Sequence, residues 1–207
     1  MLIGVTIAVG YDRTLQDRKT TMKPIIISGG AGAGKTSLVD ALARRGYMTF
    51  PEVSRTLIRE QAAMPDGILP WTDLPRFAAM CLDSMSSQRE QALRGTIPAF
   101  VDRAIGDICA YLTIGGVAVD AHYQTMAKGY FPTVFVCAPH ADIYVQDEER
   151  PHTFAESMEI HRQLVKTYRE LSYEVVDVPW GSIEQRADWV LSQLKSMPFN
   201  SQLLSGE

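Results

Sequence analysis

The sequence is poor in asparagine, in cysteine and in net charge, and each shortage excludes a class of protein. Its one asparagine, Asn200, belongs to no glycosylation sequon, and the N-K-x-D base reader of Ras-type GTPases cannot be formed elsewhere. The three cysteines are far apart and make no C-x-x-C pair, so we expect free thiols in a reducing compartment instead of disulfides or a zinc site. They are Cys81, Cys109 and Cys137.

Charge and long apolar runs are also scarce. The net charge is −4 and no block of like charges occurs, so we expect no extended nucleic-acid interface. The longest apolar stretch near the start, residues 2–9, is too short to span a bilayer and lacks a basic leader. These features predict a cytoplasmic protein without a membrane span.

From residue 24 onward, short apolar runs alternate with helical patterns, which is typical of an α/β fold with a parallel sheet covered on both faces. The proline at position 98 conflicts with a strand interior, and the conflict disappears if Ile97 and Pro98 lie at the strand entrance. The expected strands are 24–28, 47–50, 96–101, 133–137 and 174–178. The expected helices are 34–45, 54–64, 74–95, 104–114, 119–127, 154–171 and 183–194.

Residues 1–22 differ from the alternating pattern and are expected to form an N-terminal extension. Three interpretations compete for it: an added edge strand, an arm that packs on a partner, as in a homodimer, or disordered sequence upstream of a start at Met22. Residues 23–196 are expected to form the folded domain, and residues 197–207 a flexible tail.

A glycine-rich motif follows the first expected strand and opens the first expected helix. Residues 29–36 match G-x-x-x-x-G-K-[ST] in full. Backbone N–H groups of such a loop converge on phosphates, Lys35 supplies positive charge, and Thr36 is placed to join the shell of Mg²⁺. The expected nucleotide-binding residues are Gly29, Gly30, Ala31, Gly32, Ala33, Gly34, Lys35, Thr36 and Ser37.

The third expected strand is followed by Asp102 and Arg103, not by the Asp-Glu pair of motor ATPases. A carboxylate at this strand end suits a Mg²⁺-bound water or an oriented substrate, so Asp102 is a candidate metal and catalytic residue. The planar guanidinium of Arg103 suits recognition of a transferring phosphate. The competing interpretation is a surface ion pair or a helix cap.

Glu52 follows the second expected strand, at the sheet edge where ligands bind in α/β proteins. It could accept a proton from an attacking hydroxyl group or grip a sugar hydroxyl, with help from Arg55. Alternatively, it is a solvent-facing carboxylate at a helix start.

The charged stretch 147–152 lies where small-molecule kinases carry a lid that closes over the nucleotide. Arg150 is the first candidate for a lid arginine and Arg162 the second, whereas the plain alternative is a solvated loop. Trp71 fits either a wall of an acceptor site or the core. His122 and His161 are expected to pack or to lie on the surface, not to bind a ligand.

Taken in order, residues 29–36 (GGAGAGKT), 50–55 (FPEVSR), 100–103 (FVDR) and 143–150 (IYVQDEER) resemble the AAA-type ATPase/kinase family that is related to the kinase domain of bifunctional nicotinamide riboside kinases. The resemblance covers residues 23–194. It implies a three-layer P-loop NTPase fold with a five-stranded parallel sheet of order 2-3-1-4-5. It also implies that Glu52 contacts the acceptor, Arg103 stabilises transferring charge and Arg150 comes from a lid.

The sequence therefore predicts a protein that binds ATP or GTP with Mg²⁺. A small-molecule kinase acting on a hydroxyl of a nucleoside-like or other metabolite is the leading hypothesis. A nucleotide-dependent switch or a weak ATPase acting with a protein partner are the alternatives.

Overall fold

Strand β1 (Ile25–Ser28) lies at the centre of the sheet because its residues are apolar or small and all are buried. The other strands are β2 (Met48–Phe50), β3 (Ala99–Asp102), β4 (Thr133–Val136) and β5 (Glu174–Asp177). Every pairing is parallel, and the strand order is β2-β3-β1-β4-β5, as expected. The computed structural model describes residues 22–144 and 153–197.

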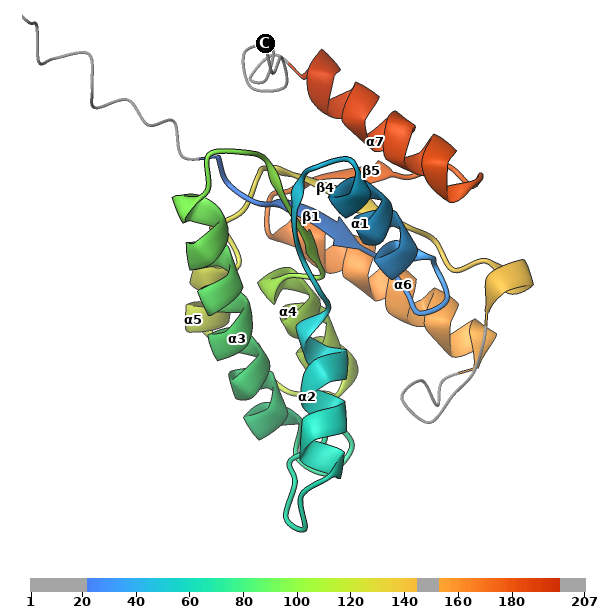
Figure 1. Ribbon diagram of the computed structural model, residues 1–207. Coiled ribbons are helices and arrows are strands. Elements are labelled where there is room, and N and C mark those ends of the chain that lie inside the picture. The colour runs from blue at the N-terminus through green and yellow to red at the C-terminus, as the bar shows by residue number, and fades with distance from the viewer. Residues whose placement is uncertain (1–21, 145–152, 198–207) are drawn as a thin grey trace, which may run out of the picture.

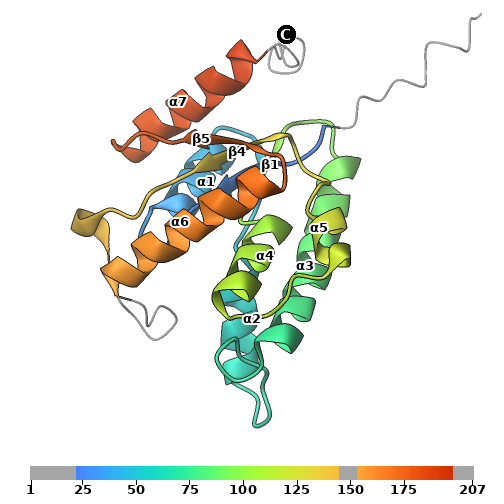
Figure 2. The ribbon, with the colours of Figure 1, turned by 180° about the vertical axis from the view of Figure 1, so that it is seen from behind.

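Helices cover both faces of this sheet and give a three-layer α/β fold (Figure 1). Their bounds are α1 Lys35–Arg44, α2 Val53–Ala62, α3 Leu74–Arg94, α4 Ile105–Ile114, α5 Ala121–Met126, α6 Phe154–Glu170 and α7 Ile183–Ser196. Helices α1 and α7 lie together above the sheet in Figure 1, and α3 to α6 lie below it. Figure 2, seen from behind, shows α6 and α4 on this second face.

The alternation of side chains along β1 divides the core into two parts. Ile25 and Ile27 pack with Leu38 and Leu42 of α1 and with residues of α7. Ile26 points to the opposite face and packs among residues of α3 and α4. Both faces are apolar because a parallel sheet covered by helices on each side has no solvated face.

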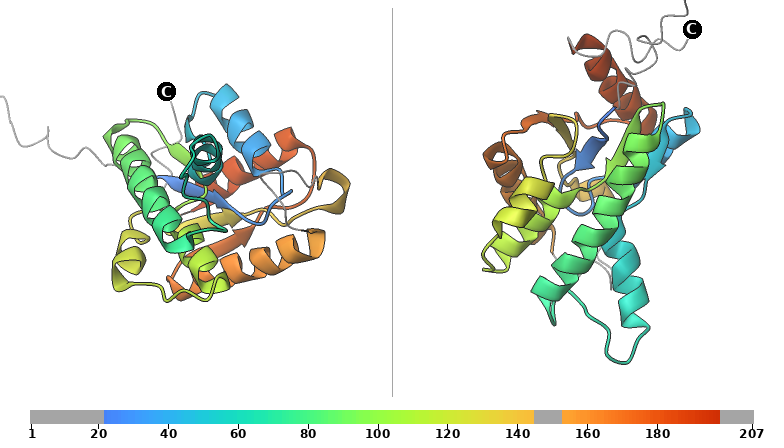
Figure 3. Two further views of the ribbon diagram at one scale, coloured as in Figure 1. Left: turned by 90° about the horizontal axis from the view of Figure 1, so that it is seen from below. Right: turned by 90° about the vertical axis from the view of Figure 1, so that its left-hand side faces the viewer.

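Helices α2 and α3 project from the sheet as a pair and are joined by residues 63–73, at the bottom of Figure 1. Figure 3 shows the same pair from two further sides. Helix α2 begins directly after β2, so the pair stands beside the carboxyl edge of the sheet. This is the edge at which open α/β sheets bind their ligands.

Side chains cap most of the long helices. Asp73 accepts a hydrogen bond from the N–H of Arg76 at α3, and Thr153 and Ser182 form capping boxes at α6 and α7. Helix α1 differs from these three, because its N-cap residue is Gly34 and no side chain caps its start. Its first N–H groups are therefore left for another acceptor.

The expected elements are all present, with ends shifted by a few residues. Strand β3 begins at Ala99, which places Ile97 and Pro98 before it and removes the proline conflict. The carbonyl of Pro98 still accepts a hydrogen bond from Met48. A 3₁₀ turn, η2 (Ala141–Ile143), was not expected. Residues 1–21 of the expected N-terminal extension, residues 198–207 of the expected tail and the charged stretch 147–152 with Arg150 lie outside the described residues. Within the described parts, no helix is long and apolar enough to cross a membrane.

One close packing contact fixes α4 against α6. A Cβ on Gly106 would lie 2.5 Å from Cε1 of Tyr168, whose ring is fully buried. Alanine normally stabilises a helix relative to glycine. Here we expect Gly106→Ala to lower the free energy of unfolding by about 1–3 kcal/mol, because the ring must move.

Urea denaturation checks this prediction. In a Tyr168→Leu background the obstructing ring is gone, and the same Gly106→Ala change should cost much less. An equal cost in both backgrounds would show that the contact with Tyr168 is not its cause.

Candidate active site

The phosphate-loop motif takes a conformation that needs glycine. Gly32 and Gly34 both have a φ of 68°, in the left-handed region. A Cβ on Gly32 would lie 2.4 Å from the ring of Tyr144, and one on Gly34 would lie 2.7 Å from Nη1 of Arg186. A larger side chain at either position would overlap with these neighbours, so the loop can pack this closely only with glycine there.

Neighbouring elements bind the outer side of this loop. Ser157 on α6 donates to the carbonyl of Ala31 (2.8 Å), and Arg186 on α7 donates to that of Ala33 (3.0 Å). The N–H of His140 donates to the carbonyl of Gly32. In a trans peptide the C=O and the following N–H point in opposite directions. The N–H groups that follow these carbonyls therefore point inward, as an anion-binding loop requires.

Lys35 extends along this inner side and is 6% exposed. Its ammonium group donates to the carbonyl of Gly30 over 2.8 Å. Burial, with a further contribution from the positive charge of Arg103, lowers the pKa of Lys35 to about 8. A buried lysine next to another cation favours an anionic partner, which the phosphates of a nucleotide would supply.

Thr36 and Asp102 come together at the start of α1 and the end of β3. The Thr36 hydroxyl donates to Oδ2 of Asp102 over 2.8 Å, whereas the buried Oδ1 atom has no hydrogen-bond partner among the described residues. Burial raises the pKa of the Asp102 carboxyl group. A hydroxyl and an unsatisfied carboxylate oxygen are hard ligands, so this pair fits Mg²⁺ or one of its waters.

Arg103 lies between two carboxylates. Its Nε donates to Oε1 of Glu52 and its Nη1 donates to Oδ1 of Asp107, both over 3.0 Å. The backbone N–H of Arg103 donates to the carbonyl of Ile27 and so extends the pairing of β3 with β1 by one residue. The φ angle of Arg103 is 70°, a left-handed conformation that costs a non-glycine residue about 1–2 kcal/mol. The two ion pairs hold Arg103 in this conformation. The side chain of Arg103 is only 6% exposed, so the alternative of a surface ion pair is wrong for this residue.

Asp107 was not singled out from the sequence, yet it joins this cluster to the core. It accepts hydrogen bonds from Ser28, Arg103 and Tyr168, and from the N–H of Ala104. The last of these is a helix-start contact that an aspartate in the first turn of α4 could have suggested. Arg103 is only four residues away, whereas Ser28 and Tyr168 come from distant parts of the chain.

Glu52 faces the cavity from the N-terminus of α2 and is also held by Ser54, whose hydroxyl donates to Oε1 over 2.8 Å. Burial alone would raise the pKa of Glu52, but the charges of Arg103 and Lys35 outweigh it and bring the pKa to about 2. The carboxylate is therefore ionised at neutral pH and can accept a hydrogen bond from a hydroxyl group. It is a weak base, better suited to orienting a nucleophile than to removing its proton early.

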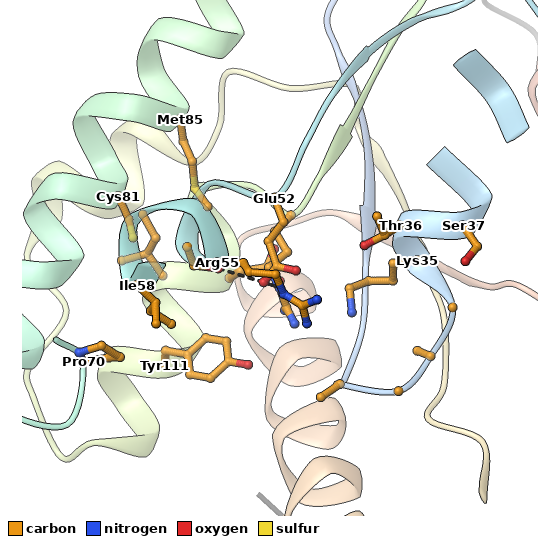
Figure 4. A pocket seen from close by; sticks show the side chains of 18 of the residues that line it. Lys35, Thr36, Ser37, Glu52, Arg55, Ile58, Pro70, Cys81, Met85 and Tyr111 are labelled. Carbon is orange, nitrogen blue, oxygen red and sulfur yellow. Dashed lines mark hydrogen bonds and ion pairs between the residues drawn. The ribbon is translucent and has the colours of Figure 1, made fainter. Parts of the chain in front are cut away.

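Lys35, Thr36, Glu52, Arg103 and Asp107 line one continuous cavity of about 830 Å³, within the range of small-molecule sites, and Asp102 lies behind Thr36, to which it is hydrogen-bonded. Figure 4 shows Lys35 and Thr36 on one side of Glu52 and Arg55, and Ile58, Pro70, Cys81 and Met85 on the other. Trp71 also lines this second side and is 57% exposed, so it is a wall of the cavity and not part of the core. Arg162 is exposed on α6, pairs with Glu159 and is not among the lining residues.

A third part of the cavity lies beyond the phosphate loop, on residues that the sequence did not suggest. Arg186 is buried, donates one hydrogen bond to the loop and lies 5.8 Å from the ring centroid of Trp180. Trp180 in turn stacks on His140 with a centroid separation of 3.6 Å. An arginine inside an amphipathic helix carries no local signal of such a role, because the phosphate loop that it contacts is 153 residues away in the chain.

Comparisons with known proteins agree with this geometry. A family model described as "AAA domain" matches residues 24–186. No protein of curated function matches the sequence.

Several solved structures share the fold, and two of those described below are kinases by name. A NadR protein in complex with NR superposes with a TM-score of 0.62 at 16% identity, over 84% of this chain and 51% of that chain. The chain thus spans about half the length of NadR. Thymidylate kinase from Ehrlichia chaffeensis gives 0.55 at 18% identity, over 84% of this chain and 98% of that chain. Shikimate kinase from Acinetobacter baumannii, in complex with shikimate, gives 0.53 at 17% identity, over 85% and 94%.

The Glu52–Arg103 pair has a testable effect on stability. A carboxylate whose pKa is lowered by folding contributes stability that is complete above its unfolded value, near 4.5, and is lost as the pH falls toward 2. We expect Glu52→Gln to lower the free energy of unfolding by about 2–3 kcal/mol at pH 7. The difference from the wild type should shrink when the measurement is repeated at pH 3.5.

Glu60→Gln is the matched control, since Glu60 is exposed on the same helix. It should change stability by less than about 0.5 kcal/mol at either pH. A Glu52→Gln effect that is the same at both pH values would contradict the ion-pair assignment.

Proposed function

The chain belongs to the AAA domain family, and we propose that it is an ATP-dependent small-molecule kinase. The proposed reaction transfers the γ-phosphoryl group of ATP to a hydroxyl group of a metabolite. The observation that carries this proposal is the continuity of the cavity. The phosphate loop lies in its middle, Arg186 and Trp180 line one end, and Glu52 with the walls from α2 and α3 lines the other.

A nucleotide site alone would account for the loop and for the end near Arg186, but not for the space beyond Glu52. A switch protein needs no second compartment next to the terminal phosphates, whereas a kinase needs one for its acceptor. Glu52, Arg103 and Lys35 interact electrostatically within this one cavity. The arrangement therefore supports transfer to a second substrate better than it supports simple nucleotide binding.

The reaction forms a bond between the acceptor oxygen and the γ-phosphorus and breaks the bond from that phosphorus to the β,γ-bridging oxygen. ADP leaves with the electron pair, and the acceptor loses its hydroxyl proton to water. Glu52 accepts the hydrogen bond of the attacking hydroxyl and orients it, while Arg103 and Lys35 offset the charge on the phosphoryl oxygens. Glu52 needs no raised pKa for this task.

Mg²⁺ would be held at Thr36 and Asp102, where its charge would offset that of the phosphates. The backbone N–H groups of residues 29–36 and the uncapped start of α1 bind the phosphate oxygens. ATP and GTP both satisfy these contacts, because the loop contacts no base. Arg150, outside the described residues, fits the role of a lid arginine in this scheme.

The three cysteines in the described core are free and buried, which fits action in a reducing cytoplasm. Within the domain of residues 23–196, the α2–α3 pair supplies the walls that decide the acceptor, and the rest supplies the nucleotide site.

Two substitutions test the proposal. Lys35→Ala should lower transfer by at least about 100-fold, because it removes charge stabilisation of the transferring group. Glu52→Gln should lower turnover by about 100-fold while the affinity for Mg-ATP changes less than about threefold, because Glu52 meets the acceptor and not the nucleotide.

The assay follows ATP consumption with a panel of metabolite hydroxyl compounds and detects the phosphorylated product by mass, and calorimetry reports the affinity for Mg-ATP and Mg-GTP. Glu60→Gln should behave as the wild type in both. Tight binding and slow hydrolysis without any phosphorylated acceptor would favour a switch, and hydrolysis stimulated only by a protein partner would favour an assembly ATPase. Either result would refute the kinase assignment.

A further inference from the structure

The acceptor end of the cavity has a chemical character that narrows the class of substrate. Building on the proposed kinase function, we infer that the acceptor is a small alcohol with an apolar body, aliphatic or aromatic, and with its polar atoms confined to the end that bears the reacting hydroxyl. The structure does not favour a polyol or a nucleoside, because these carry polar atoms along their whole length.

The walls contributed by α3 are entirely apolar or weakly polar. Phe77, Ala78, Cys81 and Met85 recur at helical spacing along one side of α3, are buried and line the cavity. Ile58 of α2 lies nearby in Figure 4, with Pro70 beside the same space. None of these side chains can pair with a hydroxyl, an amide or a ring nitrogen, apart from the weak donor of Cys81.

Strongly polar side chains gather at the opposite side of this compartment, next to the phosphate loop. Glu52 and Arg103 are paired with each other, and Asp107 is already satisfied by four donors. Arg55 also lines the cavity and lies beside Glu52 in Figure 4, on this polar side. Tyr111, from α4, directs its hydroxyl group toward this polar side and away from the α3 wall in Figure 4. Polar recognition is therefore available at one end of an acceptor only.

A polyol or nucleobase in this space would bury donors and acceptors without partners, which is costly. Sites that select such groups provide matching hydrogen bonds, and they discriminate strongly through them. An apolar body instead gains free energy from every part of the wall that it removes from water. The half-exposed Trp71 at the cavity rim provides a further aromatic surface for such a body.

The first experiment compares two pairs of acceptors that differ mainly in polarity along their body. Cyclohexanol and myo-inositol share a six-carbon ring, and benzyl alcohol and thymidine both carry a primary hydroxyl next to a ring. With saturating Mg-ATP, we expect kcat/KM to be at least tenfold higher for cyclohexanol than for myo-inositol, and for benzyl alcohol than for thymidine. Product formation is measured by mass.

The second experiment changes the wall itself. Ala78→Leu fills the acceptor compartment, and we expect it to lower kcat/KM for benzyl alcohol at least tenfold without changing the KM for ATP. Ala79→Leu is the matched control, because Ala79 is the next residue on the same helix but is exposed. It should leave both constants unchanged.

Ala78→Ser adds a hydroxyl group to the wall with little change in volume, and it carries the test if the leucine variant does not fold. We expect it to reduce the preference for benzyl alcohol over thymidine by at least threefold. Calorimetry with Mg-ATP shows that each variant retains the nucleotide site.

The outcomes separate this inference from the function on which it rests. Efficient phosphorylation of myo-inositol or thymidine, unaffected by the changes at Ala78, would overturn the apolar-acceptor inference and leave the kinase assignment standing. Failure of every acceptor, with or without binding of Mg-ATP, would overturn both.

Discussion

The site depends on one buried positive charge held between two carboxylates. Burying an unpaired guanidinium would cost several kcal/mol, and the ion pairs of Arg103 with Glu52 and Asp107 offset that cost. Asp107 is satisfied in turn by Ser28 and by Tyr168. The cluster therefore connects the carboxyl ends of β2, β3 and β1 to α4 and α6. The geometry of the site thus depends on the packing of the core.

This pairing also decides what the site can do chemically. It keeps Glu52 ionised and weakly basic, and it places a fixed positive charge beside Lys35. Such a site orients a hydroxyl group and stabilises negative charge, which is what phosphoryl transfer mainly requires of a protein. The apolar wall of α3 lies on the other side of the same carboxylate. In the proposed kinase, the strand ends would therefore supply the chemistry and the projecting α2–α3 pair would select the acceptor.

Much of the fold could be predicted, because its signals are local. Apolar runs, helical spacing and the glycine-rich turn each occupy a few consecutive residues, and even the proline before β3 indicated where that strand begins. The strand order, by contrast, came from the family resemblance. The sequence placed Glu52 after the second strand, at the edge of the sheet, where the structure also has it. Whether its side chain faced solvent or a partner was open, because its partner Arg103 is 51 positions away in the chain. Asp107 and Arg186 were missed because neither belongs to a motif and because Ser28, Tyr168 and the phosphate loop, which they contact, are distant in the chain.

The amino-acid sequence by itself determined that this chain has an anion-binding loop between a strand and a helix, because backbone conformation there depends on glycines that are neighbours in the chain. It also determined a sheet covered on both faces, because periodicity is a local property. Only the tertiary structure decided which charges pair, that Glu52 has a low pKa, and that one side of α3 lines an apolar compartment as well as packing in the core. Those outcomes depend on burial and on distances between residues far apart in the chain, which no stretch of sequence contains.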